Sequence, residues 1–346
     1  MEPCVVGIDG GGTTTRAAVL DRSGQLRGVG RGGPSNYDDV GEEGARENID
    51  EAVREAQAQA GLEERPFAAA FLGLAGIVSE EDRTVVRRIA QTLELAAPEH
   101  VGAGHDARAA LAGALNGRPG VVLIAGTGSS CYGRTVTGES WMAGGWGALL
   151  ADEGSGYWLG VEAMTAAVRA HDGRGPETVL RRRVEEYLEL EDLNKIMHRV
   201  YVDGLSRTET AALAPLVFEA ARAGDEGAQA LLRRGAGELA ASVQAVAERL
   251  GMAGNGFELA RVGGLWQAGA VYADPFEAAV RERLPRCQFV PTELPPTLGA
   301  GLLALREAGR EVNESTERHL RCAAESWPHV PAGEATPYNK LPEQPT

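Results

Sequence analysis

The sequence predicts an α/β protein built from two related lobes. Two glycine-rich hairpins, one in each half of the chain, support this prediction. A short apolar strand leads into Asp-Gly-Gly-Gly-Thr-Thr-Thr at 9–15, and another leads into Gly-Thr-Gly-Ser-Ser at 126–130. The chain has 346 residues, more than one compact core usually holds and enough for two domains. A repeated hairpin suits two lobes that grip one ligand between them better than it suits a single-site Rossmann domain.

Hydrophobic patterning predicts alternating strands and helices along the first half. The segment 42–61 has apolar or small residues at helical spacing and ends at Gly61, a suitable C-terminal cap. Ser79 is placed to N-cap the next helix, whose first turn is acidic. The expected elements are strands at 4–8, 16–20 and 25–29, a helix at 42–61, a strand at 68–74 and a helix from Ser79 to about Leu95.

The second half repeats the strand followed by a glycine turn and then becomes mainly helical. The expected elements are strands at 121–125, 131–136 and 139–143, helices at about 155–170, 176–190, 192–201, 208–223 and 225–250, a strand at 260–262, and helices after Asp274 and Leu298. We place the N-terminal lobe at 1–115, completed by a helix near 298–325, and the C-terminal lobe at 116–297. The proline-rich end, 326–346, is expected to be disordered.

The turn between the first two strands has the composition of an anion site. Gly11 and Gly12 carry no Cβ, so backbone N–H groups there can approach a phosphate closely. Thr13 and Thr14 add hydroxyl donors, and Asp9 can hold a hydrated Mg²⁺ beside the phosphates. The turn is neither a Walker loop nor a Rossmann fingerprint, because it has no Gly-Lys-Ser/Thr and no helix follows it. It indicates a nucleotide-phosphate site, and an ordinary glycine-rich hairpin is the alternative.

Composition excludes several other classes of protein. The net charge is −15, from 34 basic and 49 acidic residues, which argues against a nucleic acid as partner. Apolar runs are short and interrupted, so no membrane span is expected. The four cysteines are far apart, which predicts neither a zinc site nor disulfides and suits a cytoplasmic protein. The two lysines, Lys195 and Lys340, lie outside the glycine loops, so a catalytic lysine is not expected.

Eight segments, taken in order, resemble one known family. They are GIDGGGTTTRAAVL at 7–20, PSN at 34–36, LGLAG at 72–76, HDARAAL at 105–111, IAGTGSSC at 124–131, GGWG at 144–147, DEGSGYWLG at 152–160 and VGGLW at 262–266. Their order is similar to that of the actin, Hsp70 and sugar-kinase superfamily, whose members bind ATP between two duplicated lobes. More narrowly, the chain resembles the N-acetylglucosamine kinase branch of the BadF/BadG family. The resemblance implies an α/β fold of two duplicated actin-like (ribonuclease H-like) ATPase lobes.

The resemblance also implies roles for residues along the nucleotide site. Asp106 would be the base that orients the attacking hydroxyl and takes its proton, since phosphoryl transfer itself needs little push. From its position before a helix, Asp106 could instead only N-cap that helix. Thr127 and Gly128 would form a second phosphate clamp. Gly263 and Gly264 would let adenosine lie against the backbone, with a simple strand-to-helix turn as the alternative.

The segment 144–153 is the candidate sugar pocket. Gly145 exposes backbone groups, Trp146 offers an apolar platform, and Asp152 can accept from sugar hydroxyls. A core tryptophan and a helix start at Asp152 are the alternatives. The resemblance also implies contacts from Asn36 and Asp106. Relatives often have Ser-Asn after the second Gly-Thr-Gly, and here Ser130 replaces the asparagine that would contact the sugar.

Three functions follow from these expectations. The first is an ATP- and Mg²⁺-dependent kinase that phosphorylates the 6-hydroxyl of an amino sugar, foremost N-acetylglucosamine, with glucosamine, N-acetylmuramic acid or glucose as alternatives. The second is the family's ATPase that activates a dehydratase, which needs paired cysteines for a [4Fe–4S] cluster. The third is a sugar-sensing regulator, which the acidic charge argues against. The resemblance further implies a homodimer.

Overall fold

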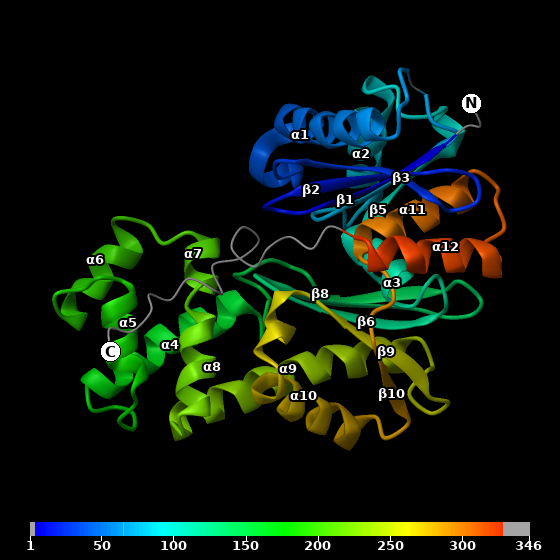
Figure 1. Ribbon diagram of the computed structural model, residues 1–346. Coiled ribbons are helices and arrows are strands. Elements are labelled where there is room, and N and C mark those ends of the chain that lie inside the picture. Colours follow the sequence, from blue (N-terminus) through cyan, green and yellow to red (C-terminus); the bar gives the residue numbers. More distant parts are fainter. Residues whose placement is uncertain (1–3, 65, 328–346) are drawn as a thin grey trace. The chain divides into compact units, whose positions relative to one another are not determined.

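Two five-stranded sheets with the same strand order organise the chain, of which the computed structural model describes residues 4–64 and 66–327 (Figure 1). The first sheet runs β3-β2-β1-β4-β5. The second, read from its β8 edge, runs β8-β7-β6-β9-β10. Each sheet therefore has its first strand at the centre, two later strands on one side and two on the other. This repetition is the structural form of the duplication that the two hairpins predict.

The first sheet and its helices form one compact unit, made of the described residues up to Val122, residues 136–138 and the described residues from Val290 on. Its strands are β1 (Val5–Gly10), β2 (Thr15–Leu20), β3 (Leu26–Gly32), β4 (Ala69–Leu74) and β5 (Val101–His105). Its helices are α1 (Tyr37–Gln59), α2 (Glu80–Thr92), the 3-10 helix Pro98–His100, α3 (Asp106–Ala114), α11 (Pro296–Glu307) and α12 (Glu314–Glu325). The expected three-strand meander is confirmed.

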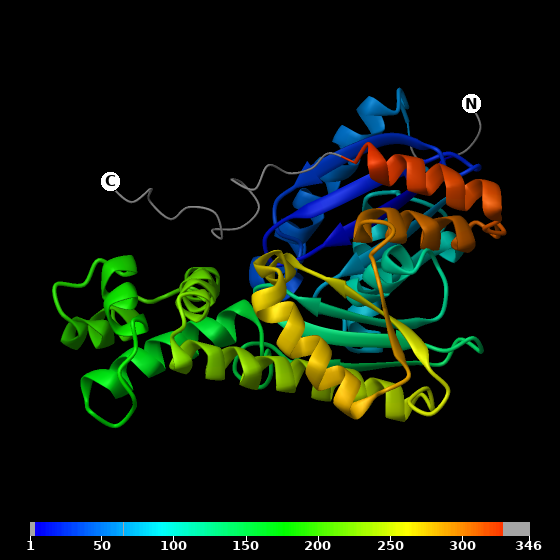
Figure 2. The ribbon, with the colours of Figure 1, turned by 60° about the horizontal axis from the view of Figure 1, so that its bottom comes forward.

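Leu123–Thr135 and Glu139–Phe289 form the second unit. The strands of the second sheet are β6 (Gly120–Ala125), β7 (Ser129–Arg134), β8 (Ser140–Gly144), β9 (Phe257–Val262) and β10 (Cys287–Val290). The helices are α4 (Gly156–His171), α5 (Leu180–Tyr187), the 3-10 helix Leu193–Lys195, α6 (Ile196–Tyr201), α7 (Arg207–Ala211), α8 (Ala214–Arg222), α9 (Glu226–Arg249), the 3-10 helix Gly264–Ala268 and α10 (Ala270–Arg283). Helix α9 packs on β7 and β8, and α4–α8 extend from one end of this sheet (Figure 2).

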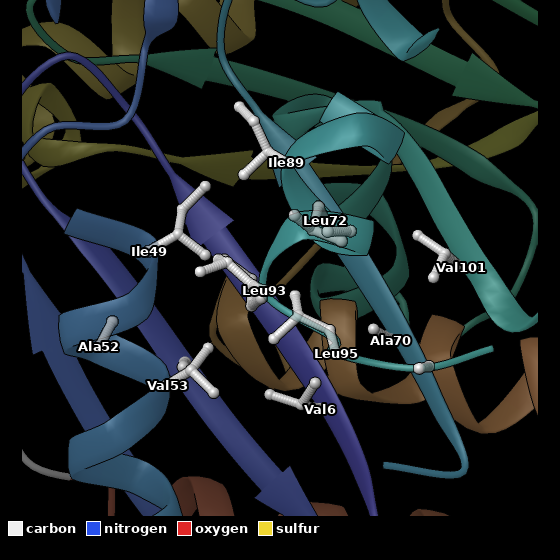
Figure 3. Close-up of a cluster of buried hydrophobic side chains, with 14 of the residues drawn as sticks. Val6, Ile49, Ala52, Val53, Ala70, Leu72, Ile89, Leu93, Leu95 and Val101 are labelled. Carbon is white, nitrogen blue, oxygen red and sulfur yellow. The ribbon is translucent and has the colours of Figure 1, made fainter. Parts of the chain in front are cut away.

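Alternate residues of the first sheet enter two separate cores. Val6 and Ile8 pack with α1 and α2 in one core, which Figure 3 shows. Val5 packs with α11 and α12 in the other core, together with Ala18 and Leu20 of β2. This period of two is what a strand buried on both faces requires. Gly7 allows the second core to form, because a Cβ there would lie 2.0 Å from the backbone nitrogen of Gly301 in α11.

Several boundaries differ from the sequence predictions. Helix α1 begins at Tyr37 instead of 42 and bends at Gly41, whose φ is +73°. The single helix expected at 208–223 is wrong: it is divided into α7 and α8. Pro215 explains the division, because it has no N–H to continue the helical hydrogen bonds. Strand β10 lies at residues for which no strand was expected.

The end of the chain is described only in part. Of the segment 326–346, which was predicted to be disordered, residues 328–346 lie outside the described residues. Trp327 is buried in the core that contains α11 and α12. Within the ranges that the structure describes, no helix has both the length and the apolar character to cross a bilayer.

Candidate active site

One row of paired residues crosses all five strands of the first sheet at a single edge. The register aligns Gly32 with Thr15, Thr15 with Gly10, Gly10 with Leu74, and Leu74 with His105. Each predicted site residue of the first unit lies at this row or within a few residues of it. The sheet therefore brings together segments that are about 100 residues apart in the sequence.

The hairpin between β1 and β2 is a tight, well-fixed turn. The Gly11 N–H donates to the Thr14 carbonyl at 3.0 Å, and the Gly11 carbonyl accepts from the Ser35 N–H at 3.0 Å. Gly12 and Thr13 at the tip are exposed. Their backbone groups can therefore meet an anion without disturbing the turn, as the phosphate prediction requires.

Asp9, the last polar residue of β1, has an altered acidity. Burial and the negative charge of Asp106 raise the pKa of its carboxyl to about 7, against the opposing effects of Arg16 and the Thr297 hydroxyl. The Thr297 Oγ1 lies 3.5 Å from Asp9 Oδ2. Two carboxylates that repel each other in this way are stabilised by a nearby cation.

Asp106 is the first residue of α3, directly after β5. The cap of this helix is His105, whose Nδ1 accepts from the Ala107 N–H at 3.1 Å, so the alternative that Asp106 serves only as the N-cap is wrong. Asp106 Oδ1 is buried and lies 2.6 Å from His105 Nδ1, the distance of an ion pair. The side chain as a whole is 27% exposed. A partly exposed carboxylate is suited to accept a proton from a ligand.

Asn36 and Ser35, which follow β3, each have a buried oxygen atom without a hydrogen-bond partner among the described residues. Asn36 Nδ2 donates to Asp39 Oδ2 at 2.7 Å, but Asn36 Oδ1 and Ser35 Oγ are buried without hydrogen bonds among the described residues. Buried polar atoms are nearly always paired, so unpaired ones call for an explanation. Ser35 is fully buried, whereas the side chain of Asn36 is half-buried at the edge of the first sheet, so its amide oxygen is the better candidate to accept from a ligand hydroxyl group.

In the second unit, the loop between β6 and β7 is tied to the start of α4. The Gly156 N–H donates to the Gly126 carbonyl at 2.8 Å, and the Tyr157 N–H donates to the Thr127 carbonyl at 3.0 Å. A further bond from the Gly126 N–H to the Gly128 carbonyl, at 2.9 Å, closes the turn. The predicted phosphate residues Thr127 and Gly128 thus lie in a rigid turn.

Asp152 fixes the same loop from the other side. Its side chain is 2% exposed, its φ is +71°, and its Oδ1 accepts from the Ser129 N–H at 2.9 Å. Its Oδ2 accepts from Arg207 Nη2 at 2.5 Å. The alternative that Asp152 starts a helix is wrong, because Ser155 caps α4. Arg207 was not among the predicted residues, and nothing in its surrounding sequence marks it.

The segment that follows β8 is open to solvent. Gly144, Gly145 and Gly147 have φ of +74°, +76° and +85°. Trp146 is 66% exposed, so the alternative of a core tryptophan is wrong. Ser130 is buried on β7, where it pairs with Gly144 in the register of β7 and β8. The predicted sugar residues of this unit are therefore close neighbours.

Gly263 and Gly264 follow β9, next to the end of β6. Gly263 has a φ of +113°, and a Cβ there would lie 2.2 Å from the Ala125 carbonyl oxygen. Glycine is thus required by the packing of the two strand ends. Gly264 begins the short helix that leads to Trp266, which stacks on Tyr272. The role of these glycines toward adenosine stays a prediction.

The donors at the first sheet suit Mg²⁺. Carboxylate and hydroxyl oxygens are the ligands that this ion prefers, and it is often held by one or two carboxylates together with substrate phosphates and water. Asp9 offers such a carboxylate, with a pKa raised by burial and by the adjacent negative charge of Asp106. Within the described ranges, no group of three or more His, Cys, Asp or Glu side chains could hold a metal. A cation here would therefore need the phosphates as ligands.

The repeated sheets and the glycine loops at their strand ends define the class, an actin-like ATPase fold of the sugar-kinase type. Comparison with known proteins gives the family. A sequence model of the BadF/BadG/BcrA/BcrD ATPase family matches residues 6–304, and the chain belongs to that family. The fold class and the family that the sequence analysis inferred are thus confirmed, and membership of an ATPase family implies the use of ATP.

Curated relatives match nearly the whole chain. An N-acetylmuramic acid/N-acetylglucosamine kinase of Clostridium acetobutylicum is 32% identical over 305 residues, which are 88% of this chain and 98% of the relative. An N-acetyl-D-glucosamine kinase of Dictyostelium discoideum is 32% identical over 310 residues, 87% of this chain and 97% of the relative. The predicted enzyme class, a sugar kinase, is confirmed by these relatives.

Solved structures agree with this placement. A Chromobacterium violaceum protein assigned as an N-acetylglucosamine kinase matches with a TM-score of 0.70 and 31% identity, over 88% of this chain and 99% of that one. A ROK family glucokinase of Streptomyces griseus, solved with glucose and AMPPNP, matches with a TM-score of 0.55 and 21% identity, over 87% and 98%. The second match shows a shared fold alone.

Proposed function

We propose that the protein transfers the γ-phosphate of ATP to the 6-hydroxyl of an amino sugar, foremost N-acetylglucosamine. The names of its curated relatives support an amino sugar as acceptor. The observation that carries the proposal is a pair of half-buried side chains at one edge of the first sheet, the Asn36 amide with an unpaired Oδ1 and the Asp106 carboxylate. A polyhydroxylated ligand can supply hydrogen-bond donors for both side chains.

Asp106 is proposed as the base of this reaction. The sugar hydroxyl oxygen forms a bond to the γ-phosphorus while the bond to the β,γ-bridging oxygen breaks, and ADP leaves with that electron pair. The hydroxyl proton passes to the Asp106 carboxylate. Because the transition state is loose, this carboxylate mainly orients the hydroxyl and takes the proton late. Its partial exposure and its position at the strand-end row, close enough to Asp9 to affect the pKa of that carboxyl, support this role.

The two glycine loops are proposed to bind the phosphates of the same nucleotide. Gly11, Gly12, Thr13 and Thr14 would donate from the β1–β2 hairpin, and Thr127 with Gly128 from the second loop. Asp9 would hold Mg²⁺ through water, and the bound ion would neutralise phosphate charge during transfer. Gly263 and Gly264 would lie against the adenosine.

The sugar is proposed to contact residues of both sheets. Asn36 and Asp106 would accept from its hydroxyl groups, Trp146 would pack on its apolar face, and Gly145 would offer backbone groups. Ser130 completes the proposed set, and Asp152, whose two oxygens are held by the Ser129 N–H and Arg207, is proposed to support the loop behind it. Ser130 is shorter than the asparagine of many relatives, so glucosamine, N-acetylmuramic acid and glucose are the competing acceptors. Pocket contacts that distinguish such sugars are worth about 1–3 kcal/mol each.

A panel assay tests the proposal. ADP release with Mg·ATP is measured against N-acetylglucosamine, glucosamine, N-acetylmuramic acid, glucose and no sugar. We expect turnover with an amino sugar and little release without one, together with a phosphorylated product whose phosphate is on O6 by NMR. Equal ADP release with and without sugar would contradict the kinase and favour the family's ATPase activity.

Three finer properties belong to the same proposal. We infer a Mg²⁺ requirement, a homodimer and a cytoplasmic location from the family resemblance and from the separated cysteines. Loss of turnover with EDTA and its recovery with Mg²⁺ would support the first. Light scattering of the purified chain measures the second, and a monomer at assay concentration would contradict it.

A further inference from the structure

The Asp152 carboxylate is one of the few buried charges in the described part of the second unit. With 2% of its side chain exposed, it would be strongly destabilised without a cation and hydrogen bonds. Arg207 supplies the cation at 2.5 Å, and the Ser129 N–H supplies a hydrogen bond at 2.9 Å. One oxygen atom of Asp152 thus faces the arginine, and the other holds the backbone directly after Gly128.

Arg207 is carried by a short helix that is itself firmly placed. Helix α7 starts with a capping box, in which Ser206 accepts from the Glu209 N–H at 3.1 Å and the Glu209 carboxylate accepts from the Ser206 N–H at 2.9 Å. Glu209 also accepts from Arg199 Nη2 of α6 at 3.0 Å. Helix α4 abuts α7, because a Cβ at Gly160 would lie 1.9 Å from the Thr210 carbonyl oxygen. The base of the Arg207 side chain is therefore anchored by two neighbouring helices.

The ion pair lies directly against Gly128 of the proposed phosphate loop. A Cβ at Gly128 would come within 2.3 Å of Arg207 Nη2 and 2.7 Å of Asp152 Oδ1. No other residue type fits at Gly128 while the pair is in place. The pair thus fixes the loop twice, through contact with Gly128 and through the hydrogen bond to Ser129.

We propose that Arg207 is a positioning residue for the sugar-kinase reaction, acting through Asp152 on the Gly126–Ser130 loop. This inference rests on the proposed function, because it assumes that the loop binds ATP phosphate and that Ser130 contacts the sugar. Without Arg207, the Asp152 carboxylate is buried with no cation beside it, which favours a turn of the side chain toward solvent. The Ser129 N–H then loses a charged acceptor, and the loop loses its fixed shape.

The chemistry of Arg207 makes the role specific to a guanidinium. Its side chain is 47% exposed, and its Nη2 alone has a hydrogen-bond partner among the described residues. A lysine has a point charge on a stem of different shape and cannot offer the planar fork of N–H donors that a guanidinium offers. The exposed side of the group leaves room for a small guanidinium ion when the side chain is truncated.

The test compares Arg207→Ala, Arg207→Lys and the matched control Arg182→Ala, whose arginine forms an exposed ion pair with Glu186 in the same helical segment. We expect Arg207→Ala to lower kcat/KM by at least about tenfold, mainly through higher KM values for ATP and sugar, with a smaller loss in Arg207→Lys. Methylguanidinium should restore part of the activity of Arg207→Ala and leave Arg182→Ala unchanged. A merely structural role would not give this rescue at an unchanged Tm.

The outcomes separate this inference from the proposed function. If the unmodified enzyme shows no sugar-dependent turnover, the proposed function fails. If the unmodified enzyme is active and Arg207→Ala keeps its KM and kcat within twofold of Arg182→Ala, the positioning role is overturned. Should Arg207→Ala not fold, Arg207→Lys decides: a folded variant with unaltered KM values overturns the proposal, and raised KM values support it.

Discussion

Two carboxylates, Asp106 in the first unit and Asp152 in the second, lie beside glycine loops but in opposite environments. Asp106 is 27% exposed, and its Oδ1 lies 2.6 Å from His105 Nδ1. Asp152 is 2% exposed, and both of its oxygens are held by Arg207 and the Ser129 N–H. The first is open to a ligand, and the second is enclosed and held by the protein. We therefore expect a role in the reaction for the first and a structural role for the second.

The largest effect is expected for Asp106→Asn. An amide cannot take the hydroxyl proton, so kcat should fall by about 10²–10⁴-fold, the range for loss of a general base. Stability should stay equal or rise, because the charge of Asp106, which together with burial raises the pKa of Asp9, is removed. Steady-state kinetics and thermal unfolding measure the two effects. Asp274→Asn, at an exposed position of α10, is the matched control and should change neither.

Asp152→Asn should show the reverse pattern. The amide keeps the shape but removes the charge that pairs with Arg207, which costs about 2 kcal/mol of unfolding free energy, less than a fully buried pair because the arginine is half exposed. Urea unfolding at neutral pH measures this. Unchanged stability together with a large loss of kcat would show that Asp152, like Asp106, acts in the reaction, and would contradict the expected difference between the two residues.

Asn36→Ala tests the proposed sugar contact in the first unit. Asn36 Oδ1 is buried without a protein partner in the described ranges, so its removal should cost little stability. The proposed hydrogen bond to the sugar would be lost, and KM for the sugar should rise by about tenfold at most, or ~1.4 kcal/mol, with KM for ATP unchanged. A parallel rise of both KM values would show that the loop, and not the sugar contact, had changed.

Tyr37→Phe is expected to have the smallest effect and concerns a carboxylate away from both loops. The Tyr37 hydroxyl donates to Asp82 Oδ1 at 2.6 Å and, with the Ser79 cap, lowers the pKa of Asp82 to about 2. The lowered pKa gives stability that is present above about pH 4 and is lost as the pH falls toward 2. The variant should lose less than about 1 kcal/mol of unfolding free energy at pH 7. Its unfolding free energy should also depend less steeply on pH between about 4 and 2. Equal pH slopes for both proteins would contradict this.

Local signals predicted much of the fold. The capping box of Ser79 is present, and the meander follows from runs of apolar residues that are sequence neighbours. The break between α7 and α8 was missed because helical spacing continues through Pro215. Strand β10 was missed because its four residues are only partly buried and carry a weak apolar pattern.

The candidate site could be predicted only where motifs mark it. Glycine turns located both loops, and the resemblance pointed to Asp106. The alternative that Asp106 is the N-cap of α3 was one residue off, because His105 is the N-cap. Arg207 could not be found, since its partner Asp152 is 55 residues earlier and no local pattern records that contact. Long-range pairs of this kind depend on the tertiary fold.

The most direct test measures sugar-dependent kcat and unfolding free energy for Asp106→Asn and Asp152→Asn side by side. The account predicts that Asp106→Asn loses at least about 10²-fold in kcat and no stability. It predicts that Asp152→Asn loses about 2 kcal/mol of stability and a smaller factor in kcat. If Asp106→Asn retained full turnover with the amino sugar, or if both variants lost rate and stability alike, the division between a reactive and a structural carboxylate would be contradicted.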